Sequence, residues 1–190
     1  MYDDRFVSEL YKALAFAVKY HGEVLQVRKS THIPYIVHPV GVMHILLEYT
    51  DDFEIVQAGI LHDILEDTKG TAEDIEKNFG SRVKKLVLGA TEPEHDDLSW
   101  EERKKHTIEY IKNKADIDTL FVICADKMHN INSVIADFSK IGEDVWKRFN
   151  RGKKQQKWYY TNLANAFLSR APDNKLFIKF YDTVFGFFKD

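Results

Sequence analysis

The sequence is poor in cysteine and has no long apolar run. Its single cysteine, Cys124, excludes an internal disulfide and is compatible with a reducing compartment. The apolar runs are too short to span a bilayer. Residues 1–20 carry charges throughout, beginning with Asp3 and Asp4, which is unlike a secretory signal peptide. We therefore expect a cytoplasmic protein with no membrane partner.

The charge balance is close to even. The chain has 27 basic and 30 acidic residues and a formal net charge of −3, so the whole protein does not attract nucleic acid. Apolar residues make up 44% and charged residues 30%, as in ordinary globular proteins. A length of 190 residues suffices for one domain with a real core, so we expect a single domain over residues 1–190. The sequence leaves the oligomeric state open.

Apolar residues recur at helical spacing along most of the chain, and no alternating strand pattern persists. Thr71 and Asp74 indicate a capping box for a short helix that Gly80 closes, and Asp173 is the expected cap of the last helix. The other helices are expected over residues 5–20, 39–49, 53–67, 81–90, 100–114, 118–138, 145–150, 153–169 and 175–188. Loops are expected over residues 23–37 and 91–99. The fold class is therefore all-α, a helical bundle.

Two histidines and two aspartates adjoin apolar stretches in three separate segments. The neighbours His62 and Asp63 follow the apolar residues 58–61, Asp126 follows residues 121–125, and His38 precedes a helix-opening proline. A buried polar cluster is costly unless its charge is compensated, and a metal ion would compensate it. Two imidazoles and two carboxylates are a plausible ligand set for one divalent cation.

Glu66 and Asp67 lie one turn beyond the predicted ligand pair. If residues 53–67 form one helix, His62 and Glu66 share a face near its C-terminal end, where the acids could act on an attacking water. Each residue alone has a simpler explanation, since a buried histidine near an acid is usually a satisfied core group. The coincidence of all four ligand candidates with Glu66, Asp67 and Asn130 nevertheless favours a metal-dependent hydrolase.

Four motifs, in order, resemble the HD-superfamily hydrolase domain of the RelA/SpoT alarmone enzymes. They are Arg28-Lys29-Ser30, PYIVHP from Pro34, LHDILEDT from Leu61 and ADKMHN from Ala125. The likeness extends from about residue 21 to residue 130. The short chain shows no synthetase portion and is most similar to the stand-alone small alarmone hydrolases. The resemblance implies an HD fold with a metal site between central helices. It also implies hydrolysis of guanosine tetra- and pentaphosphate at the 3′ position, giving GDP or GTP and pyrophosphate.

The resemblance also implies roles for individual residues. Its metal ligands would be His38, His62, Asp63 and Asp126. The ion is typically Mn²⁺ in that family, although these donors also allow Fe²⁺ or Zn²⁺. Glu66 and Asp67 match the acidic pair that handles the nucleophilic water.

A heavily charged substrate needs basic partners. The resemblance implies Arg28 at the phosphates, with Asn130 at the nucleotide and Ser133 near the ribose, and we add Lys29 beside Arg28. Second choices lie farther along the chain, and these are Arg103, Lys104, Lys153, Lys154, Lys157, Trp158 and Tyr159. For Trp158 and Tyr159 we favour core packing over a stacked nucleobase.

Two alternatives stay open. One is another HD nucleotide phosphohydrolase, such as a nucleoside monophosphatase or a ribose 2′- or 3′-phosphatase. The other is a non-catalytic nucleotide-binding HD module, which has no need of the acids that handle water. We assign no role to the remaining histidines, which are His21, His32, His44, His95, His106 and His129.

Overall fold

The structure is a computed structural model that describes residues 3–28, 31–92 and 98–189. Within these ranges it is almost entirely helical, with one isolated β-bridge between Val27 and Pro34, so the all-α prediction is confirmed. The helices are α1 (Asp4–Glu23), α2 (Val37–Leu47), α3 (Phe53–Leu61), α4 (Ile64–Asp67), α5 (Ala72–Phe79), α6 (Ser81–Ala90), α7 (Trp100–Asn113), α8 (Ile117–Ile141), the 3-10 helix η1 (Gly142–Arg148), α9 (Lys153–Arg170) and α10 (Lys175–Phe187). None of these helices is long and apolar enough to cross a membrane.

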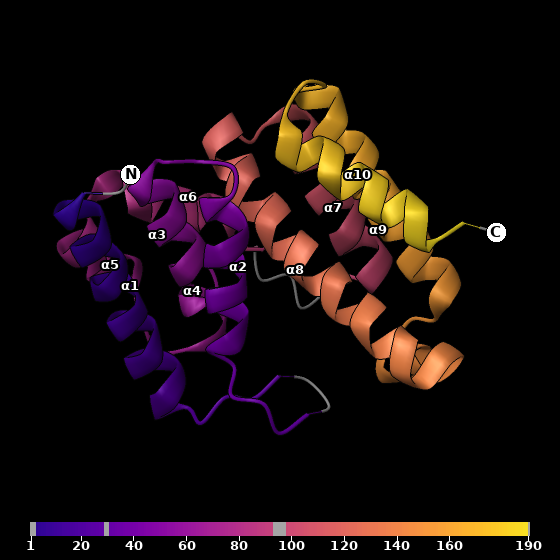
Figure 1. The fold of residues 1–190 in the computed structure, drawn as a ribbon, viewed down its shortest axis with the longest axis horizontal. Coiled ribbons are helices and arrows are strands. Elements are labelled where there is room, and N and C mark those ends of the chain that lie inside the picture. Colours follow the sequence, from indigo (N-terminus) through magenta and orange to yellow (C-terminus); the bar gives the residue numbers. More distant parts are fainter. Residues whose placement is uncertain (1–2, 29–30, 93–97, 190) are drawn as a thin grey trace.

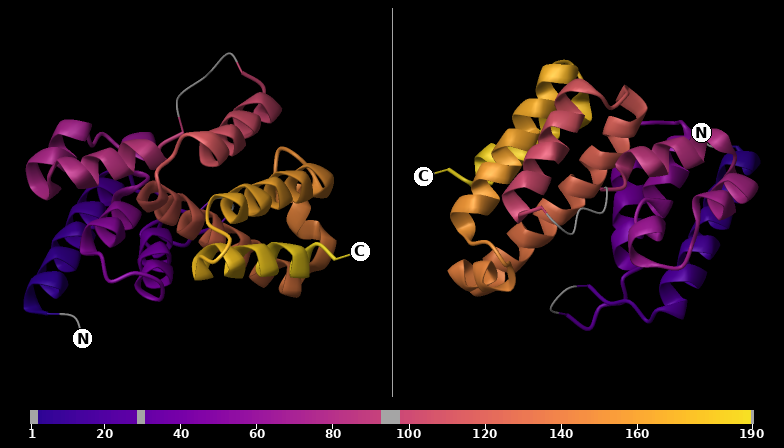
Figure 2. Two further views of the ribbon diagram at one scale, coloured as in Figure 1. Left: turned by 90° about the horizontal axis from the view of Figure 1, so that it is seen from above. Right: turned by 180° about the vertical axis from the view of Figure 1, so that it is seen from behind.

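The long helix α8 runs through the middle of the molecule (Figure 1). Helices α1 to α6 lie on one side of it and α7, α9 and α10 on the other, a division that Figure 2 shows from two further directions. Helix α8 contacts α2, α3 and α6 in the first group and α9 and α10 in the second. Residues of α8 are therefore placed to meet residues from early in the chain.

Short polar side chains begin most of the helices. The carboxylate of Asp3 accepts a hydrogen bond from the Phe6 N–H at 2.8 Å, which satisfies one of the free amides of α1. The predicted capping box of Thr71 and Asp74 is confirmed by reciprocal bonds between the two residues. The predicted cap Asp173 is wrong. Asn174, whose backbone is extended, accepts from the first amides of α10 instead.

The prediction of one helix over residues 53–67 is also wrong. Helix α3 ends at Leu61 and α4 begins at Ile64, so His62 and Asp63 occupy a turn between them. Nδ1 of His62 lies 2.7 Å from the carbonyl oxygen of Gly59. A continuing helix would offer that carbonyl to the Asp63 N–H, so this side chain competes with the helical ladder.

Smaller differences concern helix ends. Helix α2 begins at Val37, so His38 lies in its first turn rather than ahead of it, and α1 continues past Gly22 to Glu23. The short helix expected over 145–150 is the 3-10 helix η1. Most of the loop expected over 91–99 lies outside the described residues.

Buried aromatic side chains hold α10 against α8 and α9. The ring of Phe177 is fully buried, 5.3 Å from the Phe167 ring centroid and 5.8 Å from that of Phe121. We expect Phe177→Ala to lower the free energy of unfolding by about 3–5 kcal/mol, because it leaves a cavity in this cluster. Chemical denaturation measures the change. The neighbouring Ile178 is 39% exposed, so Ile178→Ala is the control and should cost about 0.5 kcal/mol or less. Equal losses in the two variants would contradict the packing role of Phe177.

Candidate metal centre

Four polar side chains from three segments lie close together, and the donor atoms of His38, His62 and Asp126 all lie within 4.8 Å of one another. His38 comes from α2, His62 and Asp63 from the turn after α3, and Asp126 from α8. Nε2 of His38 lies 3.2 Å from Nε2 of His62, 3.1 Å from Oδ1 of Asp126 and 3.5 Å from Oδ2 of Asp63. Nε2 of His62 lies 2.9 Å from Oδ2 of Asp63 and 3.7 Å from Oδ1 of Asp126. The separations among His38, His62 and Asp126 allow these three donor atoms to lie about 2.1 Å from one ion, the usual distance for such donors, and Asp63 lies beside both histidines.

The cluster is buried. The exposed fractions are 1% for His38, 4% for His62 and 8% for Asp126. Burying an ionised carboxylate is costly unless a positive charge compensates it. Burial raises the pKa of the Asp126 carboxyl, but the Lys127 ammonium, 2.7 Å from Oδ2, and the two imidazoles outweigh this effect and hold that pKa well below its usual range. Asp126 is therefore ionised in the interior of the protein.

The protonation of His62 indicates that the cluster attracts a cation. The Gly59 carbonyl can only accept, so Nδ1 of His62 carries a proton and donates it, and Nε2 is turned toward Asp63 and Asp126. Burial lowers the pKa of His62, but these two carboxylates outweigh it and hold the pKa well above its usual range. A divalent ion would satisfy the same carboxylates while His62 stays neutral, so the donor set fits a metal.

Further side chains orient the carboxylates. The Tyr35 hydroxyl donates to Oδ2 of Asp63, and Nδ2 of Asn130 donates to Oδ1 of Asp126 at 2.5 Å. Such outer partners normally fix the geometry of metal ligands. No role is assigned to Tyr35 or Lys127 from the sequence, because neither spacing nor composition indicates which carboxylate a tyrosine or lysine will contact.

His129, which was also without an assigned role, contacts His38 directly. Its Nδ1 lies 2.7 Å from Nδ1 of His38. Burial, assisted by the neighbouring His38, lowers the pKa of His129 to about 4, so its ring is neutral. One signal was present in the sequence: His129 lies three residues after Asp126, on the same face of a helix.

The acids Glu66 and Asp67 both have exposed side chains, and only Glu66 lines a cavity with members of the cluster. Oε1 of Glu66 accepts a hydrogen bond from the Glu92 N–H at 2.6 Å. The surrounding protein partly desolvates this carboxyl group and raises its pKa to about 7, which suits proton transfer near neutral pH. Oδ2 of Asp67 accepts a hydrogen bond from the Gln26 side-chain amide at 2.8 Å. Glu66 lines a cavity of about 430 Å³ together with His62, Asp63 and Asp126, and we call it the first cavity.

A second cavity of about 520 Å³ is lined in part by His129, the neighbour of His38. Arg28 is in its wall, with Nη2 donating to Oδ1 of Asn130 at 3.1 Å and its guanidinium 5.8 Å from the Tyr35 ring centroid. Ser133 also lines this cavity, although its hydroxyl donates to the backbone carbonyl of His129. Lys29 lies outside the described residues.

Some of the second-choice substrate residues lie around the first cavity, and the others line neither cavity. Arg103 lines the first cavity, and its Nε is buried without a hydrogen-bond partner in the part of the chain that the structure describes. The Lys104 ammonium is 2.7 Å from Glu92 and 5.3 Å from the ring centroid of Tyr159, so its charge is already engaged. Tyr159 is 5% exposed and packs on α7, as we favoured. The ring centroid of Trp158 lies 6.2 Å from that of Trp100, and Lys154 is exposed on α9. Trp158 and Lys154 are both absent from the described walls of the two cavities.

This fold and site define a class. The HD domain family matches residues 13–155, which is most of the chain, so the protein belongs to the HD domain family and the resemblance is confirmed.

The similar proteins point to a narrower group within the class. The chain is 36% identical over 126 residues to the guanosine-3′,5′-bis(diphosphate) 3′-pyrophosphohydrolase of Aquifex aeolicus, covering 66% of this chain and 18% of that enzyme. It is 35% identical over 111 residues to the bifunctional (p)ppGpp synthase/hydrolase SpoT of Escherichia coli, covering 56% and 16%. The aligned region thus spans less than a fifth of the length of each of these curated relatives.

Solved structures match over nearly their whole length. The crystal structure of lmo0812 from Listeria monocytogenes has a TM-score of 0.73 and 38% identity, covering 80% of this chain and 99% of that one. The structure of a metazoan ortholog of SpoT, described as hydrolysing ppGpp, has a TM-score of 0.75 and covers 98% and 97% of the two chains. Its 24% identity supports a shared fold only.

Proposed function

We propose that this protein is a metal-dependent 3′-pyrophosphohydrolase of guanosine tetra- and pentaphosphate. The observation that carries the proposal is the buried group of His38, His62 and Asp126, with Asp63 beside both histidines and Glu66 in the wall of the same cavity, in a chain similar to enzymes named for this reaction. We further propose that residues 1–190 form one hydrolase domain and that it acts in the cytoplasm. The buried thiol of Cys124 is consistent with a reducing compartment.

The residues proposed to hold the ion are His38, His62, Asp63 and Asp126, and we propose Mn²⁺ as that ion. Mixed nitrogen and oxygen donors are compatible with it and also with Fe²⁺ or Zn²⁺. When bound, such an ion lowers the pKa of water and polarises a phosphoryl oxygen. Tyr35 and Asn130 hold the two carboxylates in place through the hydrogen bonds described above.

Glu66 is the proposed general base, and Asp67 its assistant. Glu66 lines the first cavity beside three of the donors, and Gln26 orients Asp67. The water oxygen forms a bond to the phosphorus that is joined to the ribose 3′ oxygen, and Glu66 accepts the water proton. The bond from that phosphorus to the 3′ oxygen breaks, the 3′ oxygen gains a proton, and pyrophosphate leaves. GDP or GTP is the other product.

The substrate phosphates require positive partners near the metal centre. Arg28 is the first choice because it lies in the second cavity and is linked through Asn130 to Asp126. Ser133, which lines the same cavity, is a further proposed contact, and Lys29, outside the described residues, stays a proposal from the sequence. Arg103 is a second contact from the first cavity, since its buried Nε has no hydrogen-bond partner among the described residues.

Product analysis tests the proposal. We expect the Mn²⁺-loaded protein, assayed without Mg²⁺ against a nucleotide panel, to release pyrophosphate from ppGpp and pppGpp. Release of orthophosphate from nucleoside monophosphates or ribose 2′- or 3′-phosphates would instead identify another HD phosphohydrolase. Binding of nucleotides without turnover of any of them would identify a non-catalytic module.

A further inference from the structure

His129 lies between the proposed metal centre and the second cavity. It comes from α8, three residues after Asp126, and lines the cavity together with Arg28. Its side chain therefore has two possible roles: it can contact the substrate from the cavity wall, or it can orient the His38 ring through a hydrogen bond to Nδ1.

The hydrogen bond between His129 and His38 has a defined direction if His38 is a ligand. The two Nδ1 atoms are 2.7 Å apart, so one of them carries the proton and the other accepts it. Nε2 of His38 faces Asp126 at 3.1 Å and His62 at 3.2 Å, on the side where the ion is proposed to bind. A ligating nitrogen must present its lone pair, so the proton of His38 belongs on Nδ1. His129 is then the acceptor at Nδ1 and carries its own proton on Nε2.

The backbone of α2 fixes the ring of His129 from a second direction. Gly41 lies three residues after His38 on the same face of α2. A Cβ atom at Gly41 would lie 2.1 Å from Cδ2 and 2.2 Å from Nε2 of His129, far inside van der Waals contact. The imidazole therefore occupies the space that any side chain at position 41 would need. His38 and Gly41, the glycine that leaves room for the His129 ring, thus belong to one turn of α2.

We infer that His129 is a positioning residue for the metal centre: its Nδ1 accepts the Nδ1–H of His38 and so turns Nε2 of His38 toward Asp126 and His62. The inference rests on the proposed metal site but not on the identity of the substrate. It predicts that His129 acts on metal affinity before any nucleotide is bound.

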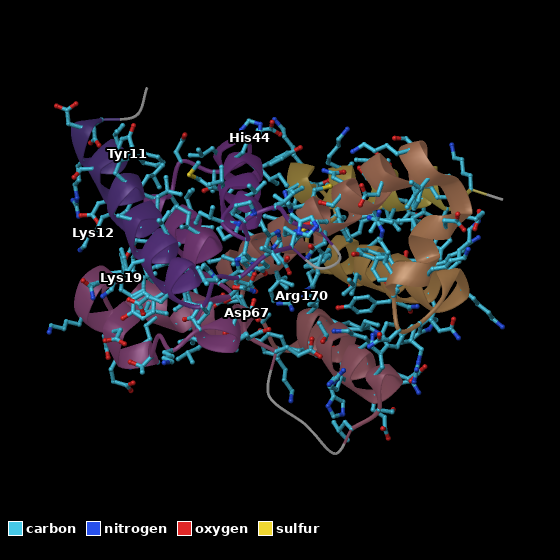
Figure 3. The ribbon with its side chains drawn as sticks, turned by 90° about the horizontal axis from the view of Figure 1, so that it is seen from below. Tyr11, Lys12, Lys19, His44, Asp67 and Arg170 are labelled. Atoms are coloured by element: carbon cyan, nitrogen blue, oxygen red, sulfur yellow. The ribbon has the colours of Figure 1, made fainter. Side chains whose placement is uncertain are left out.

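Titration of the metal-free full-length protein with Mn²⁺ alone tests this inference. We expect His129→Leu to weaken Mn²⁺ binding by about ten- to a hundredfold, the usual effect of losing such an outer partner. His129→Asn keeps an acceptor oxygen near the position of Nδ1 and should stay within about threefold of the wild type. His44→Leu is the matched control, because His44 lies on the outer face of α2 with a 76% exposed side chain (Figure 3). Circular dichroism establishes that each variant is folded.

A second readout follows the proton itself. In the Zn²⁺-loaded wild type, long-range ¹⁵N NMR spectra should show His38 protonated at Nδ1, and the exchange of that proton with water should accelerate in His129→Leu. The inference is wrong if His129→Leu binds Mn²⁺ as tightly as the wild type. It is also wrong if His129→Asn is as weak as His129→Leu, because the acceptor atom would then be irrelevant. Since no nucleotide is present, neither result depends on whether ppGpp is the substrate.

Discussion

Asp63→Ala is expected to abolish both the metal content and the turnover of the protein. Oδ2 of Asp63 is the closest donor to Nε2 of His62, at 2.9 Å, and also faces His38 at 3.5 Å. Its loss removes one of four donors and one of the two carboxylates that attract a cation. The Tyr35 hydroxyl, which donates to Asp63, loses its acceptor in the same variant.

Elemental analysis of purified protein measures the metal content, and pyrophosphate release measures turnover. Asp182→Ala on α10 is the control, because Asp182 is exposed and far along the chain from the cluster. It should retain both properties. Full metal occupancy in Asp63→Ala would remove Asp63 from the proposed ligand set, whereas lost occupancy with unchanged turnover would contradict the need for a metal.

The burial of His38, His62 and Asp126 could be predicted from the sequence, since each follows or adjoins an apolar stretch. Such a stretch is buried, and a polar residue at its end is carried into the interior unless the chain turns away. His62 and Asp126 were placed in this way, and both are buried in the structure. The family motifs then selected these positions among the other histidines and acids of the chain.

The turn at His62 and Asp63 could not be predicted, because it depends on a competition within the backbone. The apolar spacing continues through Ile64 and Leu65, so periodicity alone favours an unbroken helix. The bond from His62 to the Gly59 carbonyl decides the outcome locally. Because helix α3 ends at Leu61, the adjacent side chains of His62 and Asp63 can both contact His38. The predicted helix boundary was wrong at this position, so the sequence did not show how they do so.

Contacts between side chains that are far apart along the chain could not be predicted from the sequence either. The expected phosphate-binding residue Lys104 is engaged by Glu92 and Tyr159, which lie 12 and 55 positions away along the chain. The role of His129 depends on the close approach of α2 and α8 that Gly41 permits. Neither arrangement follows from propensity or spacing, because each is decided by tertiary packing.

Glu66→Gln is expected to keep the metal and to slow turnover by roughly a hundredfold or more, the range for losing a positioned general base. The glutamine retains a carbonyl oxygen that can accept the Glu92 N–H, as Oε1 of Glu66 does at 2.6 Å, so the local fold should survive. What the variant loses is the ability to accept a proton. This property suits Glu66, because partial desolvation raises the pKa of its carboxyl group to about 7.

Single-turnover measurements of pyrophosphate release, together with elemental analysis, separate the possible roles of Glu66. Slow hydrolysis with normal metal content would identify Glu66 as a group that acts on the water, which a non-catalytic nucleotide-binding module does not require. Loss of the metal would mean that Glu66 belongs to the ligand set. Near-wild-type hydrolysis would exclude it as the base and leave Asp67, oriented by Gln26, as the acid to test next. Glu73→Gln on the exposed face of α5 is the control and should change neither quantity.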